Sequence, residues 1–231
     1  MNKFASMQAP VKYTLREQTL WLSSQRVIYW EEAKALLLSD LHFGKTGHFR
    51  KEGIAVPQNM YKEDLQRLFQ LIQFFKPEQL IIVGDMFHSS ANKEMDFFRR
   101  WRNDFDNLHI QLVKGNHDIL KDELYRQMGI SVCDADITTC TAEGDGAFLF
   151  THDIAAADFD TIDKYVFSGH IHPGVRINGL GKQSLAFPCF YFGEQFAVLP
   201  AFSKFTGFAR IDIYKKDDVF ALVNDSVIRV N

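Results

Sequence analysis

Five short segments of this chain each carry Asp, Asn or His directly after a stretch that reads as a β-strand. In chain order they are Asp40-Leu41-His42, Gly84-Asp85-Met86-Phe87-His88, Gly115-Asn116-His117-Asp118, Thr151-His152 and Gly169-His170-Ile171-His172. Any one of them alone is typical of an ordinary turn, because Gly, Asn and Asp favour turns. All five together, in order over residues 40–172, predict a fold that gathers several strand ends at one place.

These segments supply a mixed oxygen and nitrogen ligand set. It includes the carboxylates of Asp40 and Asp85, the carboxamide of Asn116 and several imidazoles. Such a set suits a pair of transition-metal ions, and the absence of cysteine from it argues against a purely structural zinc site. Two divalent ions would outweigh the two carboxylates and attract a phosphate group. We therefore expect a dinuclear centre that activates water for attack on phosphorus.

The spacing within the segments supports this interpretation. Asp40 and His42 are two residues apart, so on an extended chain both side chains point the same way and Leu41 faces the core. The same argument applies to His170 and His172. Glycines that precede candidate ligands are expected to let the backbone turn and to leave room for ions or substrate; they are Gly84, Gly115 and Gly169.

Hydrophobic patterning predicts a layered α/β half followed by a mostly β half. Strands are expected at 19–22, 27–30, 35–39, 80–83 and 110–113, with helices at 57–75 and 93–105. Further strands are expected at 136–141, 147–151, 165–168, 174–178, 184–188 and 195–199, and a closing hairpin between 208–214 and 219–223. This order favours two packed sheets flanked by helices. Without a linker or repeat, we expect one domain over residues 1–231.

Composition and charge limit the partners and the cellular location that we expect for the protein. The chain has 231 residues, of which 46% are hydrophobic, and a formal net charge of -3 with a pI near 6.2. There is no global basic field, so any nucleic-acid binding must depend on a local patch. The start of the chain lacks an apolar leader and no apolar run is long enough to span a membrane, which predicts a cytoplasmic protein. Three cysteines without a CxxC pair are expected to be reduced thiols.

In the five segments that carry the candidate ligands, the chain resembles the calcineurin-like metallophosphoesterase superfamily. The signature of that superfamily is the ordered set Asp-x-His, Gly-Asp, Gly-Asn-His, His and Gly-His-x-His. The resemblance implies a four-layer α/β/β/α sandwich with the metals at the strand ends. It implies Asp40, His42 and His172 as ligands of one metal, Asn116, His152 and His170 as ligands of the other, and Asp85 as the bridge. His117 would then protonate the leaving oxygen or steady the transition state.

One position departs from the common pattern of that superfamily. Many members carry Asp three residues after the bridging Asp, where it orients the histidine of Gly-Asn-His. Here His88 occupies that place, as histidine does in the double-strand-break repair nucleases of the superfamily. The alternatives for His88 are a catalytic role beside His117 and a hydrogen-bonding role without chemistry.

A closer resemblance covers nearly the whole chain. It is to the bacterial ligase-associated DNA-damage-response endonucleases (PdeM-type). The residues that carry it are 39–45 (SDLHFGK), 48–51 (HFRK), 53–57 (GIAVP), 187–190 (FPCF) and 199–207 (LPAFSKFTG). Members are usually encoded beside a DNA ligase, a helicase and a second nuclease, which implies DNA repair and a functional association with those proteins.

Several residues are candidates for substrate contacts. Lys45, His48 and Arg50 follow the first metal segment and are interpreted as a rim that binds phosphate, with a solvated loop as the alternative. The aromatic residues Phe202 and Phe205, like the cluster at 190–192, are suited to base stacking, although core packing is the simpler role.

Three functions remain open at this point. The first is a phosphodiesterase, most simply a DNA nuclease, with two divalent ions that we expect to be Mn²⁺, with iron or zinc as alternatives. The second keeps the chemistry but acts on a small nucleotide, which suits a compact acidic chain. The third is a non-catalytic scaffold, which the filled set of ligand positions disfavours.

Overall fold

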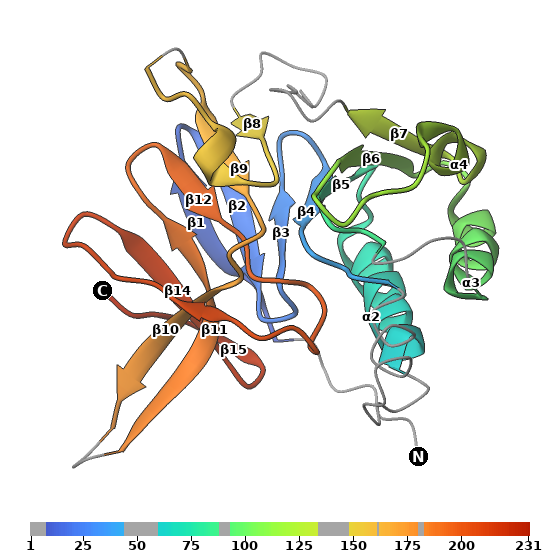
Figure 1. Cartoon of the computed structure of the whole chain (residues 1–231). Helices are drawn as coiled ribbons and strands as arrows, with labels where there is room; N and C mark the ends of the chain where they lie inside the picture. Colours follow the sequence, from blue (N-terminus) through green and yellow to red (C-terminus); the bar gives the residue numbers. More distant parts are fainter. Residues whose placement is uncertain (1–7, 44–59, 88–92, 134–147, 161, 180–182) are drawn as a thin grey trace, which may run out of the picture.

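The structure, a computed structural model, describes residues 8–43, 60–87, 93–133, 148–160, 162–179 and 183–231. These residues form two β-sheets that pack face to face, with the helices outside the first sheet (Figure 1). No helix within these ranges is both long and apolar enough to cross a bilayer.

The first sheet contains seven strands whose spatial order follows the chain. They are β1 (Val11–Leu15), β2 (Gln18–Ser23), β3 (Val27–Trp30), β4 (Ala35–Leu38), β5 (Gln79–Val83), β6 (His109–Val113) and β7 (Ile130–Cys133). The first four pair antiparallel through short turns, and β4 to β7 pair in parallel. The carboxyl ends of β4 to β7 therefore meet at one edge of the sheet.

Helices connect the parallel strands. The connections are α2 (Met60–Phe75), α3 (Lys93–Arg102) with the 3₁₀ helix η1 (Asn103–Phe105), and α4 (Asp122–Gln127). Each new parallel strand is added on the same side of the last one, and such crossovers are right-handed. All three helices consequently lie on one face of the sheet, as Figure 1 shows.

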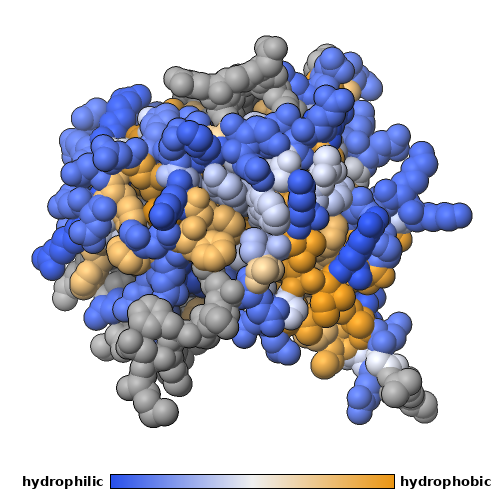
Figure 2. Space-filling view, turned by 180° about the vertical axis from the view of Figure 1, so that it is seen from behind, coloured by the Kyte–Doolittle hydropathy of each residue, from blue (hydrophilic) through white to orange (hydrophobic). Residues whose placement is uncertain are grey.

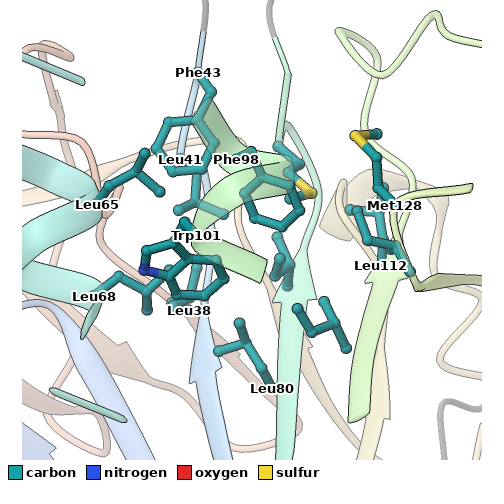
Figure 3. Packing of buried hydrophobic residues seen from close by; sticks show 14 of the residues in the cluster. Leu38, Leu41, Phe43, Leu65, Leu68, Leu80, Phe98, Trp101, Leu112 and Met128 are labelled. Atoms are coloured by element: carbon teal, nitrogen blue, oxygen red, sulfur yellow. The ribbon is translucent and has the colours of Figure 1, made fainter. Parts of the chain in front are cut away.

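The core between these helices and the first sheet follows from strand alternation. Leu36 and Leu38 of β4 face the helices, whereas Ala35 and Leu37 face the second sheet, because successive side chains point to opposite faces. Side chains of α2 and α3, among them Leu68, converge on the helix-side core (Figure 3). Burial on both faces explains why residues 35–38 are all apolar.

The second sheet contains eight strands and is mixed. They are β8 (Phe148–Phe150), β9 (Tyr165–Ser168), β10 (Pro173–Asn178), β11 (Ser184–Phe192), β12 (Phe196–Val198), β13 (Ala209–Arg210), β14 (Asp218–Val223) and β15 (Ser226–Arg229). Its inner face meets the first sheet in an aromatic layer that includes Phe148, Phe150 and Phe167, all fully buried. The two sheets thus bury one common apolar layer.

The outer face of the second sheet is covered differently. Among the described residues no α-helix packs on it. Ile211 and Ile213, in the segment after β13, pack instead against a small cluster that contains Val175 and Cys189. Seen from behind, the surface is mainly hydrophilic, and its larger apolar area lies on the side of this sheet (Figure 2).

Most expected elements are present with small shifts in their bounds, but three elements were missed and one expected pairing is wrong. The strand β1 was missed because Arg16 and Glu17 in the β1–β2 turn adopt positive φ without the Gly or Asn that marks such turns. The helix α4 and the strand β7 were also missed. The expected hairpin of 208–214 with 219–223 is wrong, since β13 pairs with β10, and β14 pairs with β11 and β15. The expected strand at 136–141 and the start of the first helix at 57–59 lie outside the described residues.

The cysteines also differ from expectation in one case. Cys133, at the end of β7, is disulfide-bonded, so the expectation of a reduced thiol is wrong there. Cys189 of β11 is a free and buried thiol, and burial raises the pKa of this thiol to about 12.

Candidate metal centre

The strand ends of both sheets bring the candidate ligands together. Asp40 and His42 follow β4, Asp85 follows β5, and the residues 116–117 follow β6 of the first sheet. His152 follows β8 and the residues 170–172 follow β9 of the second sheet. Carboxyl ends of parallel strands are the usual place for ligand sites in such sheets, and here two sheets contribute to the same site.

The first group of converging side chains surrounds Asp40. Its Oδ1 lies 3.0 Å from Nε2 of His172 and 3.8 Å from Nε2 of His42, and the two ring nitrogens are 3.4 Å apart. Its Oδ2 accepts a hydrogen bond from the backbone N–H of His170 at 3.2 Å. A Cβ on Gly169 would come within 2.7 Å of that oxygen. Asp40, His42 and His172 therefore have the spacing of a metal-binding triad.

The second group surrounds Asp85, which is almost fully buried. Its Oδ1 accepts a hydrogen bond from the backbone N–H of His117 at 2.9 Å and lies 3.4 Å from Nε2 of His152. Its Oδ2 lies 4.0 Å from Nδ1 of His42. Asp85 and His152 form a second convergent triad with Asp40, so the two carboxylates lie between the imidazoles of both groups.

The remaining candidates lie on the solvent side of the cluster. Asn116 and His170 are exposed, and the ring of His170 is 5.1 Å from the ring of His152. The side chain of His117 is 41% exposed, and its Nε2 is 3.9 Å from Oδ2 of Asp85. The buried residues thus form the floor of the site, and these three form its mouth.

The backbone at the site differs from the sequence-based expectation. Residues 40–42 and 170–172 are not extended, because several candidate ligands adopt the left-handed conformation. They are Asp40 (φ 53°), His42 (φ 49°), Asp85 (φ 52°), His170 (φ 65°) and His172 (φ 50°). The side chains converge as expected and Leu41 faces the core, but through a conformation that is uncommon outside glycine.

Two positions at the site require glycine, because side chains of candidate ligands lie very close to the backbone there. A Cβ on Gly84 would lie 1.9 Å from Nδ1 of His152, and the φ of Gly84 is +79°. A Cβ on Gly115 would lie 2.2 Å from Oδ1 of Asp85. The room that these glycines leave is thus filled by the candidate ligands themselves, rather than by ions or substrate.

Backbone carbonyls orient two of the imidazoles. Nδ1 of His152 lies 3.1 Å from the carbonyl of Val83, and Nδ1 of His172 lies 3.2 Å from the carbonyl of Gly207. If each Nδ1 donates to its carbonyl, each Nε2 is left as an acceptor that faces the cluster. Metal-binding histidines are commonly fixed in this way.

Asp118 is a buried carboxylate whose role the sequence did not reveal. Its Oδ1 accepts hydrogen bonds from the backbone N–H groups of Met86 and Phe87 at 3.0 and 3.1 Å and from the hydroxyl of Tyr125 at 3.2 Å. Its Oδ2 accepts one from the N–H of Gly115 at 2.9 Å. Asp118 therefore ties the loop after β5 to the loop after β6. Its place within the Gly115-Asn116-His117-Asp118 segment was the available signal.

A second positioning element is the segment 201–208, which we call the anchor loop. The N–H groups of Phe202 and Ser203 donate to the carbonyls of Ser39 and Asp40 at 2.8 and 3.2 Å. Further along, the carbonyl of Gly207 lies beside the ring of His172. The anchor loop thus contacts two members of the first triad, although it comes more than 150 residues after Asp40 in the chain.

The electrostatics of the cluster favour cations. Burial alone raises the pKa of Asp85, but contacts with His152 and with the N–H of His117 outweigh burial and lower this pKa below its usual range. Burial lowers the pKa of His152, but the contact with Asp85 and the charge of Asp40 raise it to about 9. The site therefore holds negative charge that stabilises positive charge placed beside it.

The residues present fit a pair of metal ions. Two buried polar atoms, Asp40 Oδ1 and His152 Nε2, have no hydrogen-bond partner among the described residues. Buried polar atoms normally have a partner, and these two belong to the two convergent groups. This buried Asp and His cluster is consistent with a dinuclear metal site.

Four of the candidate site residues lie outside the described residues. They are His88, the proposed second catalytic histidine, and Lys45, His48 and Arg50, the proposed phosphate-binding rim. Their roles stay predictions.

Comparison with known proteins agrees with this site. The calcineurin-like phosphoesterase family profile matches residues 33–153, which is more than half of the chain. The chain therefore belongs to the calcineurin-like phosphoesterase family, and the expected α/β metallophosphoesterase fold is confirmed. No curated protein matches the chain at a significant level.

Solved structures with a similar fold include a nuclease. A structure of the Pseudomonas putida nuclease MPE shares 29% identity with this chain at a TM-score of 0.78, covering 96% of this chain and 100% of that one. An Aquifex aeolicus protein of unknown function, AQ665, shares 17% identity at a TM-score of 0.40, covering 64% and 82%. The E. coli phosphoesterase Yfce shares 13% at 0.45, covering 85% and 97%. These last two TM-scores are too low to carry an argument.

Proposed function

We propose that this phosphoesterase is a nuclease that hydrolyses phosphodiester bonds in DNA. It would use two divalent ions, and Mn²⁺ is the ion that we expect first. The observation that carries the proposal is the buried Asp and His cluster, with its two convergent groups, at the strand ends of both sheets. The similarity to a nuclease over 96% of the chain supports the choice of substrate.

The proposed ligands divide between two ions. Asp40, His42 and His172 would hold one ion, Asn116, His152 and His170 would hold the other, and Asp85 would contribute to both. The support for the bridging role is geometric, since Oδ1 of Asp85 lies toward His152 and Oδ2 toward His42. When bound, such a pair of ions activates water and neutralises the charge on a phosphoryl group.

The protein's own contribution includes the proposed general acid. His117 lies at the mouth of the site, with its side chain 41% exposed and Nε2 3.9 Å from Oδ2 of Asp85. At this position its imidazolium can give a proton to the oxygen of the leaving nucleotide or stabilise the transition state by charge. The hydrogen bond from the N–H of His117 to Asp85 fixes the loop that carries this ring.

The test compares metal-dependent cleavage by the wild type and two variants. We expect Mn²⁺-dependent hydrolysis of bis(p-nitrophenyl) phosphate and Mn²⁺-dependent cleavage of circular single-stranded DNA, both abolished by EDTA. Asp85→Asn and His117→Ala should lose both activities while circular dichroism stays unchanged. Full activity in both variants would overturn the site assignment, and a wild type inactive on every DNA would overturn the substrate.

A small nucleotide is the second candidate substrate. The formal charge of -3 favours it, because the chain as a whole does not attract polyanions. Competition between an oligonucleotide and a 2′,3′-cyclic nucleotide at equal phosphate concentration decides between them. The nuclease proposal requires the oligonucleotide to be turned over with the higher kcat/KM.

The proposed biological setting is DNA repair, in functional association with a DNA ligase, a helicase and a second nuclease. The support is the sequence resemblance alone. Deletion of the gene should sensitise cells to DNA-damaging agents, and the wild type but not Asp85→Asn should restore resistance. Equal rescue by both genes would contradict a catalytic role in repair.

A further inference from the structure

A cavity of about 230 Å³ lies beside the anchor loop. Its walls include Asp64 and Arg67 from α2 and Lys204 and Phe205 from the anchor loop. Ser203, which directly precedes Lys204, donates its N–H to the carbonyl of Asp40 at 3.2 Å. The cavity is therefore adjacent to the metal centre in space but uses other side chains.

Arg67 is the most unusual group in this cavity. It is only 8% exposed, and its guanidinium stacks on the ring of Phe202 at 3.9 Å. Nη2 donates to Asp64 at 2.9 Å and to the carbonyl of Phe202 at 2.5 Å. Nε and Nη1 have no hydrogen-bond partner in the described part of the chain. Asp64 already pairs with the charge of Arg67, but two unmet buried donors are unfavourable, and the oxygens of an anion at the cavity would accept hydrogen bonds from them.

The cavity is lined by charges of both signs. Arg67 and Lys204 line it together with Glu63 and Asp64, and Arg26 lies close enough to influence both Asp64 and Lys204. Asp225 also influences Lys204, so three cations lie near three carboxylates, and an anion would be held by the two cations of the lining. Burial and the charges of Arg67 and Arg26 lower the pKa of Lys204, against the opposite effect of Asp64 and Asp225.

The anchor loop presents an aromatic ring beside these cations. Phe205 is 47% exposed, whereas Phe202 is fully buried. Proteins hold single-stranded nucleic acid with cationic side chains on the phosphates and exposed aromatic rings on the bases, and Lys204 and Phe205 offer one group of each kind.

We propose that this cavity is a phosphate subsite for a nucleotide that flanks the cleaved bond, with Lys204 on the phosphate, Arg67 beneath it and Phe205 stacked on the base. The inference rests on the proposed nuclease function and makes it more specific. A substrate that extends from the metal centre to this subsite is a polynucleotide strand, so the subsite distinguishes DNA from a small diester.

The test measures binding of a fluorescein-labelled single-stranded oligonucleotide by anisotropy in EDTA. We expect Lys204→Glu to raise Kd about 10-fold and Phe205→Ala about 5-fold or more. Lys204→Ala should reduce the slope of log Kd against log salt by about 0.7, the value for one lost phosphate contact on a single strand. Lys216→Glu is the matched control, because Lys216 is 81% exposed and lies outside the cavity.

Kinetics give the second readout. In Mn²⁺ the loss of kcat/KM for Lys204→Glu should be about 10-fold greater on the oligonucleotide than on bis(p-nitrophenyl) phosphate. Equal losses on the two substrates, or a Kd for Lys204→Glu equal to that of Lys216→Glu, would overturn the subsite and leave the nuclease proposal intact. A wild type that cleaves no DNA would overturn the nuclease proposal instead, while the anisotropy result still decides whether this cavity binds a strand.

Discussion

At the scale of single residues, the candidate metal centre depends on backbone conformations that surrounding contacts impose. Five candidate ligands adopt positive φ without being glycine, which costs about 1–2 kcal/mol for each residue. Contacts such as the hydrogen bond from His42 N–H to the carbonyl of Asp85, at 2.9 Å, hold these conformations. The strain is therefore balanced by the loops that meet at the site.

Gly115→Ala tests how tightly Asp85 is confined. The new Cβ would lie 2.2 Å from Asp85 Oδ1 and 2.6 Å from its backbone nitrogen, so the carboxylate must move. A displacement of about 1 Å costs roughly 100-fold in rate, and we expect that loss in kcat/KM for bis(p-nitrophenyl) phosphate. Gly179→Ala is the control, since among the described residues its Cβ would meet only Gln183, at 3.8 Å. Wild-type activity in Gly115→Ala would show that a side chain at position 115 does not displace Asp85.

Asp118→Asn tests the tie between the loops after β5 and β6. The substitution leaves one oxygen for four donors and points an amide N–H at another N–H, so we expect a loss of about 2–3 kcal/mol in unfolding free energy. Tyr125→Phe removes one of the four hydrogen bonds and should lose about 1 kcal/mol. Urea denaturation measures both values. A smaller loss for Asp118→Asn than for Tyr125→Phe would refute the tie.

The sequence predicted which side chains form the site better than how they are held. Metal-binding side chains carry their chemistry in the residue type, so Asp40, His42 and Asp85 could be found from motif spacing. The carbonyls of Val83 and Gly207, which orient two imidazoles, could not be found, because every residue has a carbonyl. Conformation at 40–42 was mispredicted because tertiary contacts override the local preference.

At the scale of secondary structure, the buried strands were predictable and the exposed edges were not. Residues 27–30, 80–83 and 165–168 are apolar runs bounded by polar residues, and the structure places strands there. In contrast, the partner of β14 depended on the turn at Asn224, whose φ is 53°, and on pairing across the sheet. Sequence patterns of single strands contain no information about such pairing.

Arg26→Ala tests the anchor loop as an element. Nη1 of Arg26 donates to the carbonyls of Ala201 and Ser203 at 2.9 and 2.7 Å, so its loss frees both ends of the segment that contacts Asp40. We expect a loss of about 2–3 kcal/mol in unfolding free energy and weaker Mn²⁺ binding by calorimetry.

Arg16→Ala is the matched control for this variant. Arg16 also has positive φ and donates to one carbonyl, that of Asp163, at an exposed position. It should lose less than about 1 kcal/mol and bind Mn²⁺ as the wild type does. Identical Mn²⁺ affinity in the two variants would show that the anchor loop does not position the site.

At the scale of the whole molecule, the candidate metal centre joins the two sheets. Asp40 and Asp85 come from the first sheet, and His152 and His172 come from the second. Since the sheets also share one aromatic core, we expect one cooperative unfolding transition. The assignment of residues 1–231 to a single domain stays a prediction that this transition tests.

Metal binding should therefore stabilise the entire fold. One ion at 100 times its Kd adds about 2.7 kcal/mol, which for a chain of this size raises Tm by roughly 5–11 °C. We expect Mn²⁺ to give a rise of this order by calorimetry, with a smaller rise for Asp40→Asn because its triad loses a charged ligand. An equal rise in Tm for Asp40→Asn would show that the stabilising ion binds elsewhere.

The position of the anchor loop late in the chain determines when the site can form during synthesis. Translation delivers Asp40 early, whereas the backbone segment that holds it emerges from the ribosome only after about residue 203. Until then a nascent polypeptide contains most of the ligands but not the support that places them. A nascent chain that stops before this segment should consequently bind Mn²⁺ more weakly than a chain that contains it.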